Sequence, residues 1–225
     1  MSVCIKSLIQ NMNLVIGCTN HCPYCYARNN VRRFHMVEDF AVPQFFEGKL
    51  RLMDNQKAGT YLLTGMSDLA DWQPDWLDKV LQKAAENPQN TFLFLTKSPE
   101  RLNITTELDN LWFGTTVTRR SELHRLTTLR QTVRAKHYHA TFEPLFEALG
   151  ELPLDGYEWV VPGTETGRRK GKVDARPEWV LDIAAQAQAR GIPVFMKEDL
   201  LPIMGEEAMT QQLPPSFPIK RRASC

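Results

Sequence analysis

Three cysteines within eight residues are the strongest chemical signal in the sequence. Cys18, Cys22 and Cys25 follow a C-x3-C-x2-C spacing in a short polar loop. Thiolates are soft ligands for iron–sulfur clusters and zinc, and a short loop lets three of them converge on one object. A four-iron cluster ordinarily takes four cysteines, one for each iron. The spacing therefore favours a cluster that keeps one iron open for a further molecule.

Two other interpretations of these cysteines stay open. A structural zinc site would use them together with His21 or a distant residue, although the sequence has no second C-x2-C pair. An electron-transfer cluster would need a fourth cysteine, and Cys4 and Cys225 are the candidates. The five cysteines are too clustered and odd in number to form a disulfide framework.

The cysteine loop follows the first of seven short apolar runs that we predict to be strands. Most runs are continuous rather than alternating, which is typical of parallel strands covered on both faces. The predicted strands cover residues 12–17, 60–64, 91–96, 111–116, 136–142, 159–163 and 192–196. Amphipathic stretches predict helices over residues 74–86, 121–134 and 177–190. Residues 28–44 are predicted as a further helix or as a cover over the site.

Strands that alternate with helices indicate an α/β fold with a parallel sheet. Six or seven strands fit either an open doubly wound sheet or an incomplete β/α barrel, and periodicity alone does not separate the two. Both architectures bind ligands at the carboxyl ends of the strands. The residues just past each predicted strand are therefore the candidates for function.

Polar residues and glycines follow most of the predicted strands. Charged and hydroxyl side chains near a ligand can pair with its ionic groups, and glycine lets the backbone approach closely. Each of these positions also has a purely structural explanation, as a turn, a strand end or an ion pair of Lys197 with Glu143 or Glu165. The candidate positions are Gly65, Ser67, Asp68, Lys97, Thr116, Glu143, Glu165 and Lys197.

The cysteine loop resembles that of the radical S-adenosylmethionine (SAM) superfamily, whose pattern is CxxxCx-aromatic-C. Tyr24 occupies the aromatic position. The resemblance implies a single 4Fe-4S cluster on Cys18, Cys22 and Cys25, with SAM on the open iron. It also implies reductive cleavage of SAM to a 5′-deoxyadenosyl radical that abstracts hydrogen from a substrate. The implied fold is a partial (β/α)6 TIM-type barrel, a single compact domain over residues 1–212 with a Pro-rich and basic tail over residues 213–225.

The same resemblance assigns roles to the candidate positions. Ser67 and Asp68 stand where the superfamily has a Gly-rich turn that meets the methionine ammonium of SAM. Lys97 is positioned to pair with the methionine carboxylate, and Thr116 to reach the ribose hydroxyls. Taken in order along the chain, the similarity extends to a small subgroup found in phages and mobile elements, through the motifs TGMSD, LTKSPERL, FEPL, PGTETG and FMKED.

Composition sets limits on partners and location. The sequence has 27 Lys and Arg against 26 Asp and Glu, a formal charge of +1, so any basic binding surface must be local. No apolar run approaches the roughly 20 residues that cross a bilayer, and we expect a cytoplasmic protein without a membrane partner. Basic residues at 168–172 and 220–222 could bind a phosphate-bearing substrate. The expected substrate is a nucleotide, a nucleic acid or a peptide.

Two further partners follow from the radical SAM resemblance. It implies an external one-electron donor of the flavodoxin or ferredoxin type, and the compact chain leaves room for a partner protein. The alternative is a non-catalytic zinc or iron–sulfur interaction module.

Overall fold

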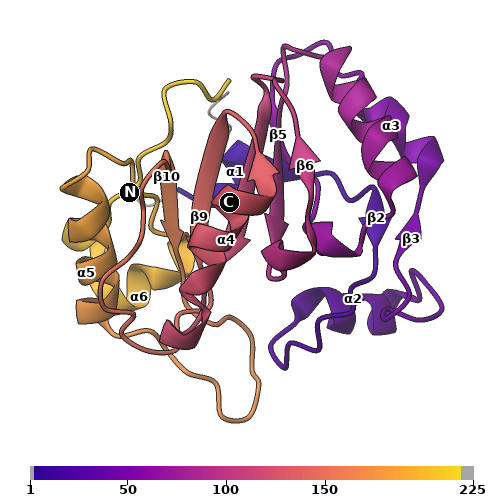
Figure 1. Cartoon of the computed structure of the whole chain (residues 1–225). Coiled ribbons are helices and arrows are strands. Elements are labelled where there is room, and N and C mark those ends of the chain that lie inside the picture. The colour runs from indigo at the N-terminus through magenta and orange to yellow at the C-terminus, as the bar shows by residue number, and fades with distance from the viewer. Residues whose placement is uncertain (1–2, 219–225) are drawn as a thin grey trace.

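A curled sheet of six parallel strands forms the centre of the molecule (Figure 1). The structure, a computed structural model, describes residues 3–218. In spatial order, the strands are β1 (Ile9–Asn11), β4 (Thr60–Leu62), β5 (Thr91–Thr96), β7 (Leu111–Thr116), β9 (His137–Phe142) and β10 (Trp159–Pro162). This order follows the chain without the reversal that defines a doubly wound sheet. The prediction of a partial TIM-type barrel in one α/β domain is thus confirmed.

Side chains alternate between the two faces of this sheet. Along β5, Phe92 and Phe94 belong to the large core outside the barrel, whereas Leu93 belongs to a second cluster that includes Trp112 and Trp159. The same period of two runs through the neighbouring strands, because successive side chains of a strand point to opposite faces. Each strand therefore contributes one row to the core and one row to the barrel interior.

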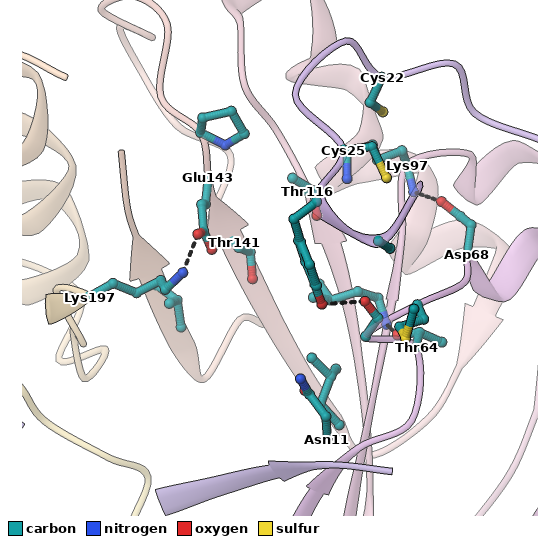
Figure 2. A pocket seen from close by; sticks show the side chains of 18 of the residues that line it. Asn11, Cys22, Cys25, Thr64, Asp68, Lys97, Thr116, Thr141, Glu143 and Lys197 are labelled. Atoms are coloured by element: carbon teal, nitrogen blue, oxygen red, sulfur yellow. Dashed lines mark hydrogen bonds and ion pairs between the residues drawn. The ribbon is translucent and has the colours of Figure 1, made fainter. Parts of the chain in front are cut away.

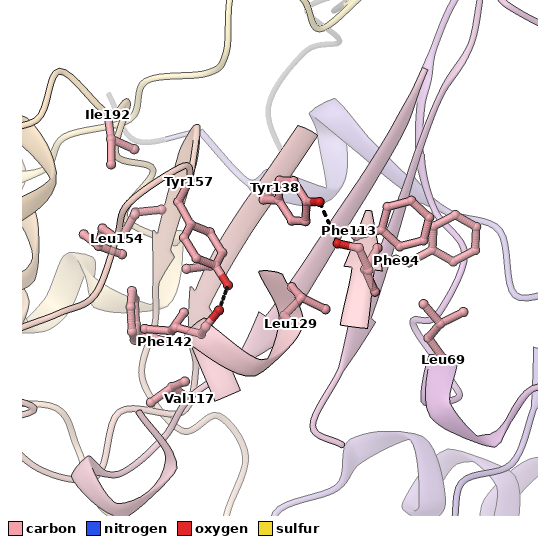
Figure 3. Close-up of a cluster of buried hydrophobic side chains, with 14 of the residues drawn as sticks. Leu69, Phe94, Phe113, Val117, Leu129, Tyr138, Phe142, Leu154, Tyr157 and Ile192 are labelled. Carbon is pink, nitrogen blue, oxygen red and sulfur yellow. Dashed lines mark hydrogen bonds between the residues drawn. The ribbon is translucent and has the colours of Figure 1, made fainter. Parts of the chain in front are cut away.

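The large core lies between the sheet and the helices around it. Aromatic rings from neighbouring strands stack there, with Phe94 and Phe113 centroids 5.1 Å apart. Two buried tyrosines place their hydroxyls on backbone carbonyls: Tyr138 donates to Val133 and Tyr157 to Leu126 (Figure 3). Burying these hydroxyls with an acceptor avoids the cost of an unpaired polar group. The core therefore holds the strands, and with them the strand ends, in fixed positions.

Within the described residues, three helices pack on the outside of the sheet, and a fourth, α2, directly follows the cysteine loop. The long helices are α3 (Pro74–Ala85), α4 (His124–Thr132) and α5 (Pro177–Gln188), and α2 spans Tyr26–Phe34. Proline opens both α3 and α5, at the first residue of the predicted helices 74–86 and 177–190. The short helices are α1 (Ile5–Leu8) and α6 (Leu201–Met204), and the 3-10 turns are Glu47–Met53, Leu69–Asp71, Pro99–Arg101, Arg120–Glu122, Glu198–Leu200 and Glu206–Ala208.

Several predicted boundaries are wrong. The first strand of the main sheet is β1, whereas only Val15 and Ile16 of the predicted run 12–17 form a strand, β2 (Val15–Ile16), which pairs antiparallel with β3 (Gln44–Phe45). Residues 192–196 form only isolated bridges, including Val160 with Val194. The predicted helix 121–134 begins late at His124 and ends at Thr132, because its last residues form β8 (Val133–Arg134), which pairs with β6 (Ile104–Thr105).

Helices do not follow every strand. The described residues between β5 and β7 contain a 3-10 turn and β6 but no α-helix, and those between β9 and β10 are loop. Helix α2 ends at His35, whose positive φ of 50° stops it, so the predicted segment 28–44 is one short helix and a loop. No helix in residues 3–218 is long and apolar enough to cross a membrane.

Part of the predicted C-terminal tail packs against the barrel. Phe217 is 6% exposed, and its ring lies 4.8 Å from Trp112 and 5.3 Å from Trp159. Leu213 packs against the same cluster. Residues 219–225, which include the basic run 220–222 and Cys225, lie outside the described residues.

Candidate active site

A cavity of about 440 Å³ opens at the carboxyl ends of the parallel strands. Figure 2 shows side chains from separate strands and loops turned toward it, among them Cys25, Thr116 and Glu143. All twelve site residues named from the sequence line this one cavity: Cys18, Cys22, Tyr24, Cys25, Gly65, Ser67, Asp68, Lys97, Thr116, Glu143, Glu165 and Lys197. The fold therefore gathers these residues, and the roles assigned to them stay predictions.

The three cysteines lie on the loop that leads into α2. They are half-buried free thiols, and Cys25 is the N-cap residue of the helix. Two backbone N–H groups point at sulfurs: Asn20 at Cys18 and Arg28 at Cys25, each at 3.4 Å. Burial raises the pKa of the Cys18 thiol to about 12. A bound metal would supply the positive charge that a buried thiolate needs there.

Two aspartates anchor the cysteine loop to the sheet side of the cavity. Asp71 accepts from the backbone N–H and the hydroxyl of Thr19, both at 2.7 Å, and from Arg101 at 2.8 Å. These hydrogen bonds outweigh burial and lower the pKa of the Asp71 carboxyl. Asp68 accepts from the side-chain amide of Asn20 at 2.8 Å. Hydrogen bonds to these two carboxylates therefore hold the loop between Cys18 and Cys22 in place.

Asp68 is also the meeting point of two strand ends. Its side chain accepts from the Thr96 hydroxyl at 2.6 Å, the Lys97 backbone N–H at 2.8 Å and the Ala70 N–H at 3.0 Å. With Asn20, four donors satisfy a carboxylate that is only 4% exposed. A carboxylate has about four lone-pair sites, so protein donors use all of them. The geometry makes Asp68 an anchor for the cysteine loop and for the end of β5.

Two tyrosines fix the other side of the loop. The ring of Tyr24 packs edge-on against Phe146, with centroids 5.3 Å apart, and so connects the loop to the segment after β9. The Tyr26 hydroxyl donates to the carbonyl of Gly65.

A Cβ atom at Gly65 would lie 2.8 Å from Asn13 Oδ1 and 3.0 Å from Asn11 Oδ1. Glycine is therefore required at this turn by close packing.

Glu143 and Lys197 form an ion pair across the mouth of the cavity (Figure 2). Their side chains are 26% and 14% exposed. Burial alone would lower the pKa of Lys197, but the charges of Glu143 and Asp199 outweigh it and raise the pKa. A Cβ atom at Gly163 would lie 3.1 Å from both side chains, so this glycine makes room for the pair.

Glu165 binds other residues of its own loop. Its buried carboxylate takes a bidentate contact from Arg169, at 2.6 and 2.8 Å, and a backbone N–H from Val173 at 3.3 Å. The Arg169 hydrogen bonds lower the pKa of Glu165 against the opposing effect of burial. In the predicted basic run 168–172, Lys172 is also paired, with Asp174 at 2.8 Å. Two of its four cations thus serve the loop itself.

The remaining predicted residues have simpler surroundings. The Ser67 hydroxyl accepts from the indole N–H of Trp72 at 3.0 Å. Lys97 is half-buried at the end of β5, and Thr116 is 3% exposed at the end of β7. These two side chains make no hydrogen bond within residues 3–218, which leaves both free to meet a bound molecule.

The sequence analysis missed several cavity residues. Asn11, Thr141, His139 and Asp199 all line the cavity. Strand periodicity could have found two of them, because His139 and Thr141 lie on one face of β9 and Glu143 continues their spacing of two just past its end. Counting back in twos from the recognised Glu143 would have named both. Asn11 was missed because the first strand was placed too late in the sequence.

The donor set at the cavity fits a soft metal centre in kind, because three thiols share one loop. Within residues 3–218, no group of three or more His, Cys, Asp or Glu side chains is arranged to hold a single metal ion. A four-iron cluster needs a different arrangement, in which each cysteine binds its own iron. The three thiols therefore fit a cluster better than a single metal ion.

Fold and site together define a class of α/β proteins with a parallel half-barrel and a cysteine loop at the carboxyl ends of its strands. A family model described as a protein of unknown function, DUF5131, matches residues 4–204. The chain therefore belongs to the DUF5131 family. A search of curated proteins finds no match.

Solved structures of spore photoproduct lyase share the fold. A mutant with dinucleoside spore photoproduct has a TM-score of 0.51 and 10% identity, over 87% of this chain and 74% of that chain. A second mutant, with bound AdoMet and dinucleoside spore photoproduct, has a TM-score of 0.49, 10% identity and the same coverage. At this identity the likeness concerns the fold of the half-barrel.

Proposed function

We propose that this protein is a radical SAM enzyme with a single 4Fe-4S cluster. Cys18, Cys22 and Cys25 would hold three irons of the cluster, and SAM would bind the fourth. When bound, the pair supplies a 5′-deoxyadenosyl radical by reductive cleavage of SAM, and this radical abstracts hydrogen from a substrate. The substrate would be a nucleotide, a nucleic acid or a peptide.

One observation carries this proposal: the cysteine loop opens onto the same cavity as the polar strand ends. A cluster used only for structure would not need a lined cavity of about 440 Å³ beside it. Sites of this kind bind small molecules through a few placed polar groups on largely apolar walls. The half-barrel shared with spore photoproduct lyase supports the proposal at the level of the fold.

The protein's own residues prepare the site before any cofactor binds. Asp68 and Asp71 hold the cysteine loop through Asn20 and Thr19, so the thiols are positioned at little entropic cost. Lys97 and Thr116 are the side chains proposed to meet the carboxylate and ribose hydroxyls of SAM. The Glu143–Lys197 pair places charge at the opposite wall, where it is proposed to orient the bound cofactor.

An external one-electron donor, of the flavodoxin or ferredoxin type, is part of this proposal. Its docking side is proposed to be α2, which follows Cys25 directly and carries Arg32 and Arg33 on its exposed surface. Charge complementarity steers such encounters, and an acidic donor would be attracted to this helix.

Anaerobic reconstitution tests the function. We expect about four irons per chain and reductive formation of 5′-deoxyadenosine from SAM, by the one-iron-per-cysteine logic of such clusters. Both should be lost in Cys22→Ala, whereas Asp75→Ala, at an exposed position of α3, should keep both. Stoichiometric zinc without iron would favour the alternative, a non-catalytic interaction module. Full turnover in Cys22→Ala would show that the ligand assignment is wrong.

A further inference from the structure

A buried histidine lies in the interior of the barrel, away from the cysteines. His139, in β9, is 2% exposed and still contributes to the lining of the cavity. It stands two residues before Thr141 and four before Glu143, on the same face of the chain. Since a strand rises about 3.3 Å per residue, His139 lies deeper in the barrel than the ion pair at the mouth.

A glycine on the neighbouring strand leaves space for this ring. His139 pairs with Gly114 of β7, and a Cβ atom there would lie 2.3 to 2.6 Å from three atoms of the imidazole. Glycine in the middle of a strand costs stability because it has no side chain to pack. Its presence lets the ring cross β7 and reach the carbonyl of Phe94 in β5, at 3.1 Å from Nε2.

This contact fixes the chemistry of the ring. A carbonyl only accepts, so Nε2 carries the proton and Nδ1 is left as an acceptor. Nδ1 is buried and has no hydrogen-bond partner within residues 3–218. Burial lowers the pKa of His139 to about 4, so the ring is neutral at physiological pH. An unpaired buried acceptor costs free energy that a leucine or phenylalanine here would avoid.

The surroundings of the ring are apolar and aromatic. The indole of Trp159 lies 6.0 Å from His139, and Leu93 and Val161 of the same interior cluster also line the cavity. A charged group placed against these walls would have to lose its water, which is costly, and Nδ1 requires a hydrogen-bond donor. A flat heterocycle with an N–H satisfies both requirements, because its faces match the walls and its edge donates.

We propose that His139 is a substrate-recognition residue whose Nδ1 accepts a hydrogen bond from a ring N–H of a nucleobase-type substrate. This inference deepens the proposed function, because it names the substrate class of the same cavity. Thr141 and the Asn11 amide, which line the same cavity, supply further neutral polar contacts. Enzymes that act on a base read its edge by hydrogen bonds in this manner.

Equilibrium dialysis of the reconstituted holoenzyme tests the proposal. The probes are uridine, thymidine, guanosine and inosine, each with a ring N–H, and N3-methyluridine, which lacks it. We expect uridine to bind about tenfold more tightly than N3-methyluridine, as one unpaired acceptor implies. His139→Phe should bind both equally, and His139→Asn, which keeps an acceptor near the position of Nδ1, should restore the preference.

The ratio of the affinities for uridine and N3-methyluridine distinguishes recognition from a merely structural role. A loosened fold would weaken the binding of both nucleosides to the same extent. His124→Phe, at an exposed position of α4, is the matched control and should keep the wild-type ratio. Binding of none of the four nucleosides, or a wild-type ratio near one, would overturn the proposal. Displacement of uridine by saturating SAM would also overturn it, since the site would then belong to the cofactor.

The two proposals can fail separately. If the chain binds zinc and forms no 5′-deoxyadenosine but keeps the uridine preference, the recognition site stands and the radical chemistry does not. If 5′-deoxyadenosine forms but the preference is absent, the reverse holds.

Discussion

The carboxylate of Asp68 offers the sharpest test of how the site is held together. Asp68→Asn keeps the size of the side chain but turns one oxygen into an NH2 group. One oxygen accepts from Ala70 N–H and the Thr96 hydroxyl, and the other from Asn20 and the Lys97 N–H. The Thr96 hydroxyl and the Asn20 amide can each reverse to accept. Whichever way the new amide turns, however, one backbone N–H faces a second donor.

The cost follows from burial. Asp68 is 4% exposed, so water does not replace the missing acceptor. A hydrogen bond to a charged group contributes about 1.5–3 kcal/mol, and an unsatisfied buried donor costs a similar amount. We therefore expect the closed state of the cysteine loop to lose about 2–3 kcal/mol. Since each 1.4 kcal/mol is a factor of ten, iron should leave the variant about 30- to 140-fold faster.

The assay follows the release of iron to an excess of chelator under anaerobic conditions, after reconstitution of wild type and variant. Asp78→Asn is the matched control, because Asp78 lies exposed on α3 and the same chemical change should leave the rate of release unaltered. Wild-type iron retention together with weaker SAM binding would refute the reasoning. Asp68 would then contact the cofactor and would not anchor the loop.

Three further outcomes concern the interior and the mouth of the barrel. Gly114→Ala should lower the free energy of unfolding in urea by about 1–3 kcal/mol, because the added Cβ would overlap the His139 ring. An unchanged midpoint of urea unfolding would show that the ring moves freely. The contribution of His139 to stability should fall by about 3 kcal/mol between pH 6.5 and pH 4, because the unfolded state takes up a proton that His139, with its pKa lowered to about 4, does not. Asp199, whose pKa burial raises to about 6, contributes in the opposite direction over the same range, so the measurement is the difference between the wild-type and His139→Asn profiles. Parallel profiles would contradict the assignment. Lys197→Met should lower the free energy of unfolding by about 2–3 kcal/mol, because it leaves Glu143 partly buried and unpaired. Adding Glu143→Gln should recover part of this loss. Additive losses in the double variant would show that the two residues are not coupled.

Local spacing was enough to predict the site in outline. The C-x3-C-x2-C loop and the polar residues after the strands are short-range features, and parallel strands bring their carboxyl ends to one edge. Continuous apolar runs such as Phe92 to Leu95 marked central strands because they are covered on both faces. These signals require no knowledge of contacts between distant segments.

The missed features depend on such contacts. The run 12–17 reads as a strand of the main sheet, yet Val15 and Ile16 pair with Phe45 and Gln44 instead. Phe217 was predicted to belong to a Pro-rich and basic tail, yet its ring packs edge-on against both Trp112 and Trp159. A single sequence does not show which partner an apolar residue finds. Tertiary packing decided these positions.

Most carboxylates at the cavity already have partners, whereas a few polar groups there have none. Asp68, Glu143 and Glu165 have protein donors or a cation and hold loops and strand ends in place. The unpartnered polar atoms at the cavity, among the described residues, include the two carboxylate oxygens of Asp199 and the uncharged Nδ1 of His139. A neutral acceptor loses less on desolvation than an ion does, and it gains most from a ligand that also excludes water. Around His139, where the walls are apolar, this favours a neutral, flat group of the substrate whose edge donates a hydrogen bond to Nδ1.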